Sequence, residues 1–310
     1  MESQLNAAFQ VEPRHFQRPW GGQRLAKGSR PAGDPIGESW VVHEDNLVVS
    51  GAHKGKSVAQ LAQELGAAFL GTDVLGRRFP VLLKLLDPAR WLSVQVHPND
   101  EQARRLVGPE ELGKTEAWHI VEAEPGAELI LGLKEGTTHA QLAAAMASPA
   151  IEQLLLRHPV NAGDTFYVPA GTLHAIGPGM LVVELQQTSD TTFRAYDWGS
   201  GRELHLKNTL EVASPQNRGV RTPLPPSGQG TLLQSDRFKL ELLSSNADPV
   251  LLDSAGKSFH LITVIEGSAR MAGAGWALQL SRLETAVVPA NAGPYTLQPL
   301  KTFRALKSSV

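Results

Sequence analysis

The most informative pattern of hydrophobic and polar positions in the chain is a strict alternation over residues 92–98. One predicted face is apolar and the other is polar: Leu92, Val94 and Val96 against Ser93, Gln95 and His97. Such an alternation predicts a half-buried β-strand. Its polar face lacks lysine and aspartate and carries a hydroxyl, an amide and an imidazole instead. We interpret it as the wall of a polar cavity inside a β-barrel, with Gln95 and His97 directed at a metal ion; a simply solvated polar face is the alternative.

Two further predicted strands hold charged side chains within apolar runs. Residues 79–86 are almost continuously apolar and contain Lys84. A lysine in such a run is rarely buried without a counter-charge, so Lys84 either extends outward or faces a polar cavity. Residues 181–188 place Glu184 on a polar face together with an amide and a hydroxyl.

Two more stretches add a carboxylate and a second imidazole. In the predicted strand at residues 114–121, Lys114 and Glu116 share one face. Residues 163–176 predict a strand that enters a Pro-x-Gly turn and emerges at His174. Near the start of the chain, Glu38 precedes a predicted strand and would need a partner if it were buried.

Helical patterns are few and short. Ser57 and Gln60 form a capping-box pattern that opens a predicted helix through about residue 69. Residues 99–106 predict a short capped helix, and the Ala- and Leu-rich residues 137–158 predict an inserted helical pair or lid.

A Pro-, Gly- and Ser-rich stretch at residues 214–230 predicts a connection between two domains. The prediction is an N-terminal catalytic domain, residues 1–213 with helical segments near 57–70 and 137–158, and a C-terminal domain, residues 231–310. Two segments of the second part weakly repeat the first: residues 259–267 resemble 118–126, and residues 283–294 resemble 163–174. This repetition indicates a second barrel that lacks the candidate ligands.

Composition restricts the classes of function. The 310 residues include 42% hydrophobic and 19% charged residues, and the net charge is −2. We therefore expect a globular protein without a nucleic-acid or membrane partner. No cysteine is present, which excludes disulfides and thiolate metal sites. We find no signal-peptide pattern and no apolar run near 20 residues, so a cytoplasmic location is expected.

His97, Glu116 and His174 together supply enough donors for a catalytic metal ion that keeps an open position, and Gln95 would add an amide oxygen. Zn²⁺, Mn²⁺, Fe²⁺, Co²⁺ and Ni²⁺ all fit this donor set. Lys84, Lys114 and Arg194 are expected at the same cavity. Because three cations beside a metal repel one another, a phosphate dianion is the natural ligand; an ordinary ion pair or solvent exposure is the alternative for Lys114.

Several motifs resemble those of type I phosphomannose isomerase (mannose-6-phosphate isomerase), and most closely its short bacterial form. They run in order along the chain: Ser93-Val-Gln-Val-His-Pro-Asn-Asp100, Gly113-Lys-Thr-Glu-Ala-Trp118, Val168-Pro-Ala-Gly-Thr-Leu-His174 and the segment from Gln187 to Trp198. Trp20-Gly-Gly22 and Gly37-Glu-Ser-Trp40 extend the resemblance to the N-terminal part.

The resemblance implies a mainly β fold of two cupin-type (jelly-roll) β-barrels with a small helical insertion, and one zinc ion per chain. Matched motif by motif, it implies these roles: metal ligands Gln95, His97, Glu116 and His174, catalytic residues Arg194 and Lys114, and substrate-binding residues Ser93, Lys84 and Glu184. The implied reaction interconverts mannose 6-phosphate and fructose 6-phosphate through a cis-enediol. Its general base is not identified, although Glu184 qualifies if it faces the cavity.

The chain departs from the family pattern at Asn99-Asp100, where two aspartates are common, and at Ala117-Trp118-His119. Neither departure falls on an implied ligand, but both bear on substrate preference. Two other functions remain as alternatives: a non-catalytic sugar-phosphate-binding cupin and an iron-dependent cupin oxygenase. The oligomeric state is left open.

Overall fold

The structure, a computed structural model, describes residues 6–26, 35–74, 76 and 78–310. It divides into two compact units. Unit 1 comprises Met1–Arg14, Trp40–Leu82 and Leu224–Val310, and unit 2 comprises His15–Ser39 and Leu83–Pro223. The chain passes from unit 2 to unit 1 at Leu224, inside the predicted connection 214–230, and residues 40–82 group with the C-terminal strands. Whether residues 1–213 fold as a domain by themselves stays a prediction.

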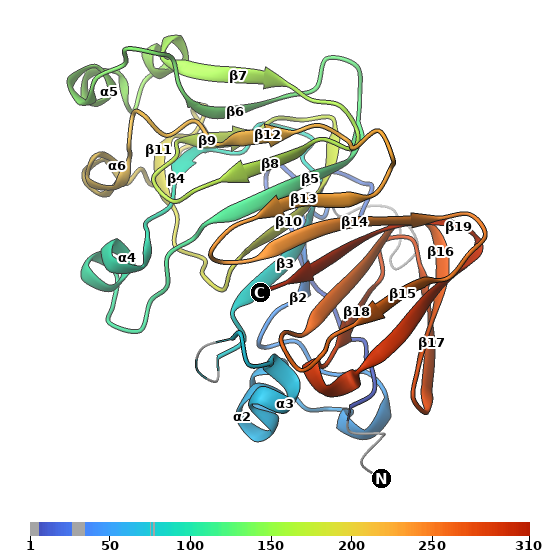
Figure 1. Cartoon of the computed structure of the whole chain (residues 1–310). Helices are drawn as coiled ribbons and strands as arrows, with labels where there is room; N and C mark the ends of the chain where they lie inside the picture. The colour runs from blue at the N-terminus through green and yellow to red at the C-terminus, as the bar shows by residue number, and fades with distance from the viewer. Residues whose placement is uncertain (1–5, 27–34, 75, 77) are drawn as a thin grey trace. The chain divides into compact units, whose positions relative to one another are not determined.

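Unit 2 is built on two antiparallel sheets (Figure 1). The first has the order β1 (Arg14–Phe16), β2 (Glu38–Val42), β3 (Val81–Leu86), β10 (Met180–Gln187), β5 (Glu116–Ala123), β8 (Thr165–Val168), β12 (Val220–Thr222). The second has the order β11 (Phe193–Tyr196), β4 (Val94–Val96), β9 (His174–Ile176), β6 (Glu128–Leu133), β7 (Leu155–Pro159). Trp118 and Phe166 of the first sheet pack with Leu129 and Ile176 of the second in one buried cluster, so the two sheets lie face to face.

Unit 1 contains the C-terminal sheet. Its order is β13 (Gly230–Gln234), β14 (Lys239–Ser245), β19 (Pro294–Ser309), β16 (His260–Gly273), β17 (Trp276–Ser281), with β15 (Val250–Asp253) on β19 and β18 (Thr285–Val288) on β16. Short 3₁₀ turns lie at η1 (Gly51–His53) and η3 (Ala290–Ala292). The prediction of a mainly β fold is confirmed, but closed barrels, which were also predicted, are not found in the described part of the chain. Each strand order runs from one edge to another, so the sheets are open and do not close into rings.

The helices follow their capping residues. In α2 (Val58–Leu65), Ser57 and Gln60 form both reciprocal hydrogen bonds of the predicted capping box. Asn99 caps α4 (Asp100–Leu106) in the same way. The remaining helices are α3 (Ala67–Leu70) and α6 (Leu206–Val212).

The helical prediction over residues 137–158 was too long. Only α5 (His139–Ala145) and the 3₁₀ turn η2 (Pro149–Gln153) are helical, and β7 follows at once. Ala147 has a positive φ of 63°, which ends the helix before Pro149. Residues 155–159 then pair with β6 as an edge strand, an interaction that helical periodicity does not reveal.

Strand register gathers the polar side chains of unit 2. Gln95 on β4 lies directly opposite His174 on β9 and Arg194 on β11, so these three form one row across the second sheet. Directly opposite residues in a sheet project from the same face. In the first sheet, Glu184 pairs with Trp118, and the next inward position of β5 is Glu116. Polar groups from both sheets therefore enter the space between them.

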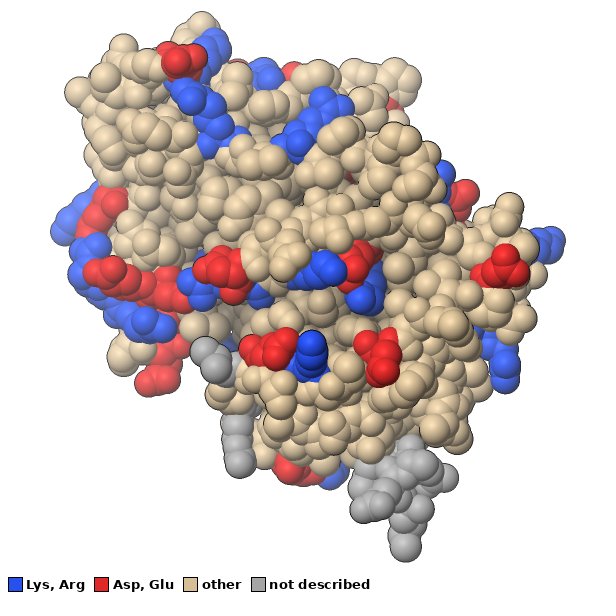
Figure 2. All heavy atoms as spheres, viewed as in Figure 1, with Lys and Arg blue, Asp and Glu red and all other residues tan. Residues whose placement is uncertain are grey.

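Charged side chains of both signs are mixed on the face of the molecule shown in Figure 2, in agreement with the net charge of −2. Around α4, for example, Arg105 pairs with Glu211. Within the described part of the chain, no helix combines the length and the apolar character that crossing a membrane requires.

One polar pair is buried in unit 1. His260 is 6% exposed, and its Nδ1 lies 2.8 Å from the Tyr295 hydroxyl. Burial lowers the pKa of His260 to about 4, and the charge of Lys307 acts in the same direction. The imidazole is therefore neutral in the folded chain at pH 7.

This histidine predicts a loss of stability in acid. Below pH 6.5 the unfolded histidine binds a proton that the folded one accepts only near pH 4, so stability falls as the pH drops through this window. The contribution is about 3 kcal/mol, from roughly 1.4 kcal/mol per pKa unit. In His260→Gln the melting temperature should fall less between pH 7 and pH 4.5 than in the wild type. Equal falls in both proteins would contradict the assignment.

Candidate metal centre and cavity

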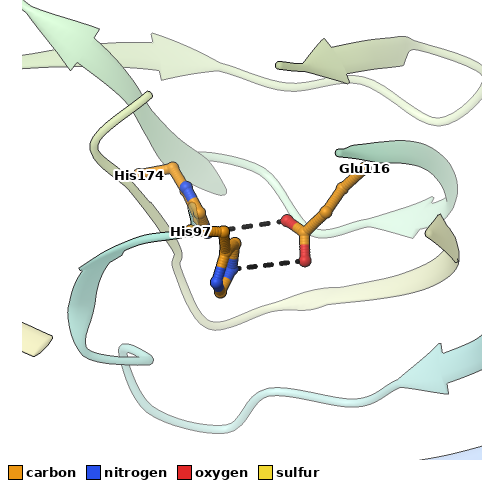
Figure 3. Close-up of side chains that lie close together, drawn as sticks. All are labelled: His97, Glu116 and His174. Carbon is orange, nitrogen blue, oxygen red and sulfur yellow. Dashed lines mark ion pairs between the residues drawn. The ribbon is translucent and has the colours of Figure 1, made fainter. Parts of the chain in front are cut away.

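Three buried side chains converge between the sheets of unit 2. His97 directly follows β4, Glu116 begins β5 and His174 begins β9. Each is 1% exposed, and one donor atom of each lies within 4.8 Å of the others. Figure 3 shows both imidazoles turned toward the Glu116 carboxylate. His97 Nε2 lies 3.4 Å from Oε1, and His174 Nε2 lies 3.5 Å from Oε2. The structure thus brings together the three principal metal ligands predicted from the sequence.

Backbone carbonyls determine which nitrogen of each imidazole carries the proton. His97 Nδ1 lies 2.8 Å from Thr191 O, and His174 Nδ1 lies 2.9 Å from Thr172 O. A carbonyl oxygen only accepts hydrogen bonds, so each Nδ1 must donate. In a neutral imidazole, Nε2 is then the unprotonated nitrogen, and this arrangement is typical of metal-binding histidines. Two lone pairs consequently point at a carboxylate.

The pKa values agree with these protonation states. Burial lowers the pKa of His97 to about 3, assisted by the nearby charge of Lys114. Burial likewise lowers the pKa of His174. Burial alone would raise the pKa of Glu116, but the positive charge of Lys114 holds it well below its usual range. Both imidazoles are neutral and the carboxylate is ionised at pH 7.

This donor set fits a divalent cation. Both oxygens of Glu116 are buried, and while the Lys114 ammonium lies beside Oε1, Oε2 accepts no hydrogen bond. Lone pairs of two imidazoles facing a carboxylate repel it unless a cation lies between them. Donors about 2.0–2.1 Å from a tetrahedral zinc ion are about 3.3–3.4 Å apart. The two nitrogen–oxygen separations, 3.4 and 3.5 Å, are close to this value, although the three donors together span up to 4.8 Å.

Lys114 and Gln95 adjoin the three donors. Lys114 Nζ lies 2.6 Å from Glu116 Oε1 and 3.1 Å from His97 Nε2, so its ammonium provides positive charge at the centre. The Gln95 amide nitrogen lies 3.3 Å from His174 Nε2, and its oxygen accepts a hydrogen bond from Ser93. A half-turn of the amide would present the oxygen to an ion.

Two backbone connections hold the donors in place. Gly171 has a φ of +83° and donates its N–H to His97 O, so the predicted Pro-x-Gly turn ties the two histidine segments together. Asp100 accepts hydrogen bonds from Gly113 N and from the Gln187 amide, and Gln187 in turn accepts one from Thr115 N. The loop after His97 is thereby fixed to the strand that carries Glu116.

A polar cavity of about 540 Å³ has Gln95 and Lys114 in its wall, and these two residues contact the donors, which do not line the cavity themselves. The residues of its wall include every remaining site residue predicted from the sequence: Lys84, Ser93, Gln95, Lys114, Glu184 and Arg194. Lys84 is buried in β3 and faces this cavity, which decides between the two positions considered for it.

Arg194 differs from the other cations of the wall. Among the described residues no carboxylate pairs with it, and its buried Nε has no hydrogen-bond acceptor. Burial lowers its pKa, and the neighbouring charge of Arg202 lowers it further. Arg202 itself forms a double ion pair with Asp197. The charges of Asp197, Asp190 and Glu203 act on Arg194 in the opposite direction. A guanidinium group in a cavity wall without a paired carboxylate is suited to bind an anion.

Glu184 and Lys84 form a buried pair beside the metal donors. Lys84 Nζ lies 3.3 Å from Glu184 Oε1, and Trp118 Nε1 donates to Glu184 Oε2 at 3.0 Å. Burial raises the pKa of Glu184, and the charge of Glu116 raises it further. The pKa of Lys84 is raised as well, because the charges of Glu184 and Glu38 outweigh the effect of burial.

Sequence reasoning missed several residues of the wall: Arg18, Trp20, Asp190, Arg202 and His205. Trp20 is also part of the buried core. Glu38 had been noted only as a residue that needs a partner, and it pairs with Arg18 and with Lys84. No spacing in the sequence signals these residues, because they reach the cavity from segments far apart in the chain.

Known proteins with similar sequences identify the family of this chain. The family model for the catalytic domain of type I phosphomannose isomerase matches residues 8–119. A mannose-6-phosphate isomerase of Bacillus subtilis is 36% identical over 303 residues, covering 93% of this chain and 94% of that protein. One of Streptococcus mutans is 39% identical over 267 residues, covering 81% and 83%.

Solved structures extend the agreement. A crystal structure of the mannose 6-phosphate isomerase of Bacillus subtilis superposes with a TM-score of 0.88 at 30% identity, covering 98% of this chain and all of that one. A zinc-bound mannose 6-phosphate isomerase has a TM-score of 0.79 at 15% identity, covering 97% and 99%, and therefore shows the same fold. On its sequence similarity over nearly its full length, this chain belongs to the type I phosphomannose isomerase (mannose-6-phosphate isomerase) family.

Proposed function

We propose that this chain uses the cavity of unit 2 to interconvert mannose 6-phosphate and fructose 6-phosphate, the activity of its family, with one zinc ion held by His97, Glu116 and His174. The observation that carries the proposal is the pair of unprotonated Nε2 atoms, 3.4 and 3.5 Å from the two oxygens of one buried carboxylate. Within the described residues, these three form the one group of histidine and acidic donors close enough for a metal ion, which supports one ion per chain. Gln95 is proposed as a further ligand through its amide oxygen.

When bound, zinc would act as a Lewis acid that favours the negative charge developing on the sugar oxygens. Lys114 would add a hydrogen-bond donor and a positive charge beside the same oxygens. Its ammonium lies in the wall of the cavity and next to the metal donors, so it can reach both.

The phosphate group of the substrate is assigned to the other end of the cavity, where it anchors the sugar. Among the described residues, Arg194 is the positively charged residue of the cavity wall without a paired carboxylate. Arg202 lies near enough for its charge to lower the pKa of Arg194. A guanidinium group often binds a phosphate through two parallel N–H···O hydrogen bonds. Ser93 and Lys84 would contact the sugar between the two ends. Stabilisation of the enediolate is an alternative role for Arg194.

Glu184 is proposed as the base. The reaction removes the proton from C2 of the open-chain aldose and returns a proton to C1, so a single carboxylate that accepts and then donates it accounts for the carbon-bound proton. A second proton passes from O2 to O1, between the two adjacent oxygens of the enediol. A raised pKa suits a carboxylate to this task at neutral pH. Because hexose phosphates are intracellular metabolites, the proposed place of action is the cytoplasm.

The alternatives predict different chemistry. An iron-dependent oxygenase would leave the cationic wall without a ligand, and a non-catalytic binding protein would keep the pocket without turnover.

Turnover and metal content test the function directly. The purified chain should hold about one zinc per chain and convert fructose 6-phosphate to mannose 6-phosphate in a coupled assay. A chelator should abolish the activity, and added zinc should restore it. Absence of turnover at every metal loading would contradict the proposal, and iron with uptake of oxygen would support the oxygenase instead.

His174→Ala tests the ligand assignment. Loss of one of three ligands should weaken zinc binding by about 100-fold or more and remove activity with it. Competition with a chromogenic chelator measures the affinity. His158→Ala is the matched control, since His158 is a half-buried histidine of the same unit whose ring bonds to Leu131 O. Zinc binding of wild-type strength in His174→Ala would remove that residue from the site.

Arg194→Ala should retain zinc and lose catalytic efficiency by a factor of about 100–1000, because a charge that binds the substrate anion is gone. Steady-state kinetics with metal analysis provide the measurement. Arg157→Ala serves as control, since Arg157 pairs with Glu128 and Glu152 away from the cavity. Wild-type kinetics in Arg194→Ala would refute the role.

A further inference from the structure

Glu38 has no role in the chemistry proposed above, yet it is 7% exposed and lies in the cavity wall. Its carboxylate accepts two hydrogen bonds from Arg18, one of them from Nε at 2.7 Å. On the other side, Lys84 Nζ lies 3.7 Å from Glu38 Oε2. Burial alone would raise the pKa of Glu38, but the charges of Lys84 and Arg18 outweigh it, so the pKa is lowered and the carboxylate is ionised.

Lys84 thus lies between two carboxylates, 3.7 Å from Glu38 and 3.3 Å from Glu184. The arrangement is a buried chain of alternating charge that runs from Arg18 through Glu38 and Lys84 to Glu184. In a buried environment such pairs interact strongly, so each charge affects the position and strength of the next. Trp118 donates a hydrogen bond to Oε2 of Glu184 and so fixes this carboxylate. Among these four charged groups, the Lys84 ammonium is therefore the one that we expect to shift.

We infer that Glu38, oriented by Arg18, is a positioning residue that draws Lys84 partly away from Glu184 and so keeps Glu184 basic enough to move the substrate proton. This inference rests on the proposed function, because it presupposes that Glu184 is the base. The charged groups that act on Glu184 are Glu116, Lys84, Lys114 and Glu38. Among them, Lys84 is the nearest partner of opposite charge for which the structure gives a contact.

Two substitutions should shift the pH profile in opposite directions. In Glu38→Gln, Lys84 loses one carboxylate and moves onto Glu184, which becomes a weaker base. The acid limb of the kcat/KM profile should move to lower pH, kcat should fall about tenfold, and KM should change less than twofold. In Arg18→Gln, the full charge of Glu38 acts on Lys84 and draws it from Glu184, so the acid limb should move to higher pH.

Asp164→Asn is the matched control. Asp164 is a buried carboxylate of the same unit, its partner Arg221 is about as exposed as Arg18, and the pair lies outside the cavity wall. It should lose stability as Glu38→Gln does but keep the wild-type pH profile. Glu38→Asp retains the charge and should restore most of kcat. An unchanged acid limb in both test variants, or shifts of both in the same direction, would overturn the inference.

A measurement independent of turnover separates this inference from the proposed function. In a crystal structure of the zinc-loaded Glu38→Gln variant, the distance from Lys84 Nζ to Glu184 Oε1 should be shorter than in the wild type. An unmoved lysine would refute the positioning role even if the enzyme is active. A zinc-loaded wild type without turnover would refute the proposed function and with it the role of Glu184, whereas the position of Lys84 would still show whether Glu38 positions that lysine. If Glu38→Gln does not fold, Arg18→Gln provides the same test with the opposite sign.

Discussion

The structure depends on one electrostatic constraint: three unprotonated donor groups point at one another inside unit 2. His97 and His174 donate their Nδ1 protons to backbone carbonyls, so only lone pairs remain to face Glu116. A buried carboxylate without hydrogen bonds costs several kcal/mol when no cation compensates it. The arrangement is stable only with positive charge at its centre, which Lys114 supplies in part and a divalent ion would supply in full.

The register of the strands in the two sheets brings these donor groups together. One row across the second sheet carries Gln95, His174 and Arg194, and the first sheet supplies Glu116 and Glu184 from neighbouring strands. The proposed metal donors, the proposed base Glu184 and the arginine proposed to bind phosphate are therefore positioned largely by backbone pairing. Such rigidity suits a reaction in which the same carboxylate must reach two adjacent carbons of one sugar.

Much of the site could be predicted from the sequence, because alternation places Gln95 and His97 on the polar face of a strand and Glu116 on another. Register could not be predicted: nothing in the sequence states that Gln95 lies beside His174 and Arg194. Lys84 and Glu38 were each expected to need a partner, but their pairing spans two strands and depends on tertiary structure. Over residues 137–158 the local sequence pattern predicted too much helix, because the segment after the turn η2 pairs with β6 as a strand.

Anomalous X-ray diffraction from crystals grown with zinc, recorded on both sides of the zinc absorption edge, tests the central claim most directly. The account predicts a single strong peak in unit 2, about 2.0–2.2 Å from Nε2 of His97, Nε2 of His174 and an oxygen of Glu116. A fully loaded crystal with no peak among these three side chains, or with the zinc bound elsewhere, would contradict it.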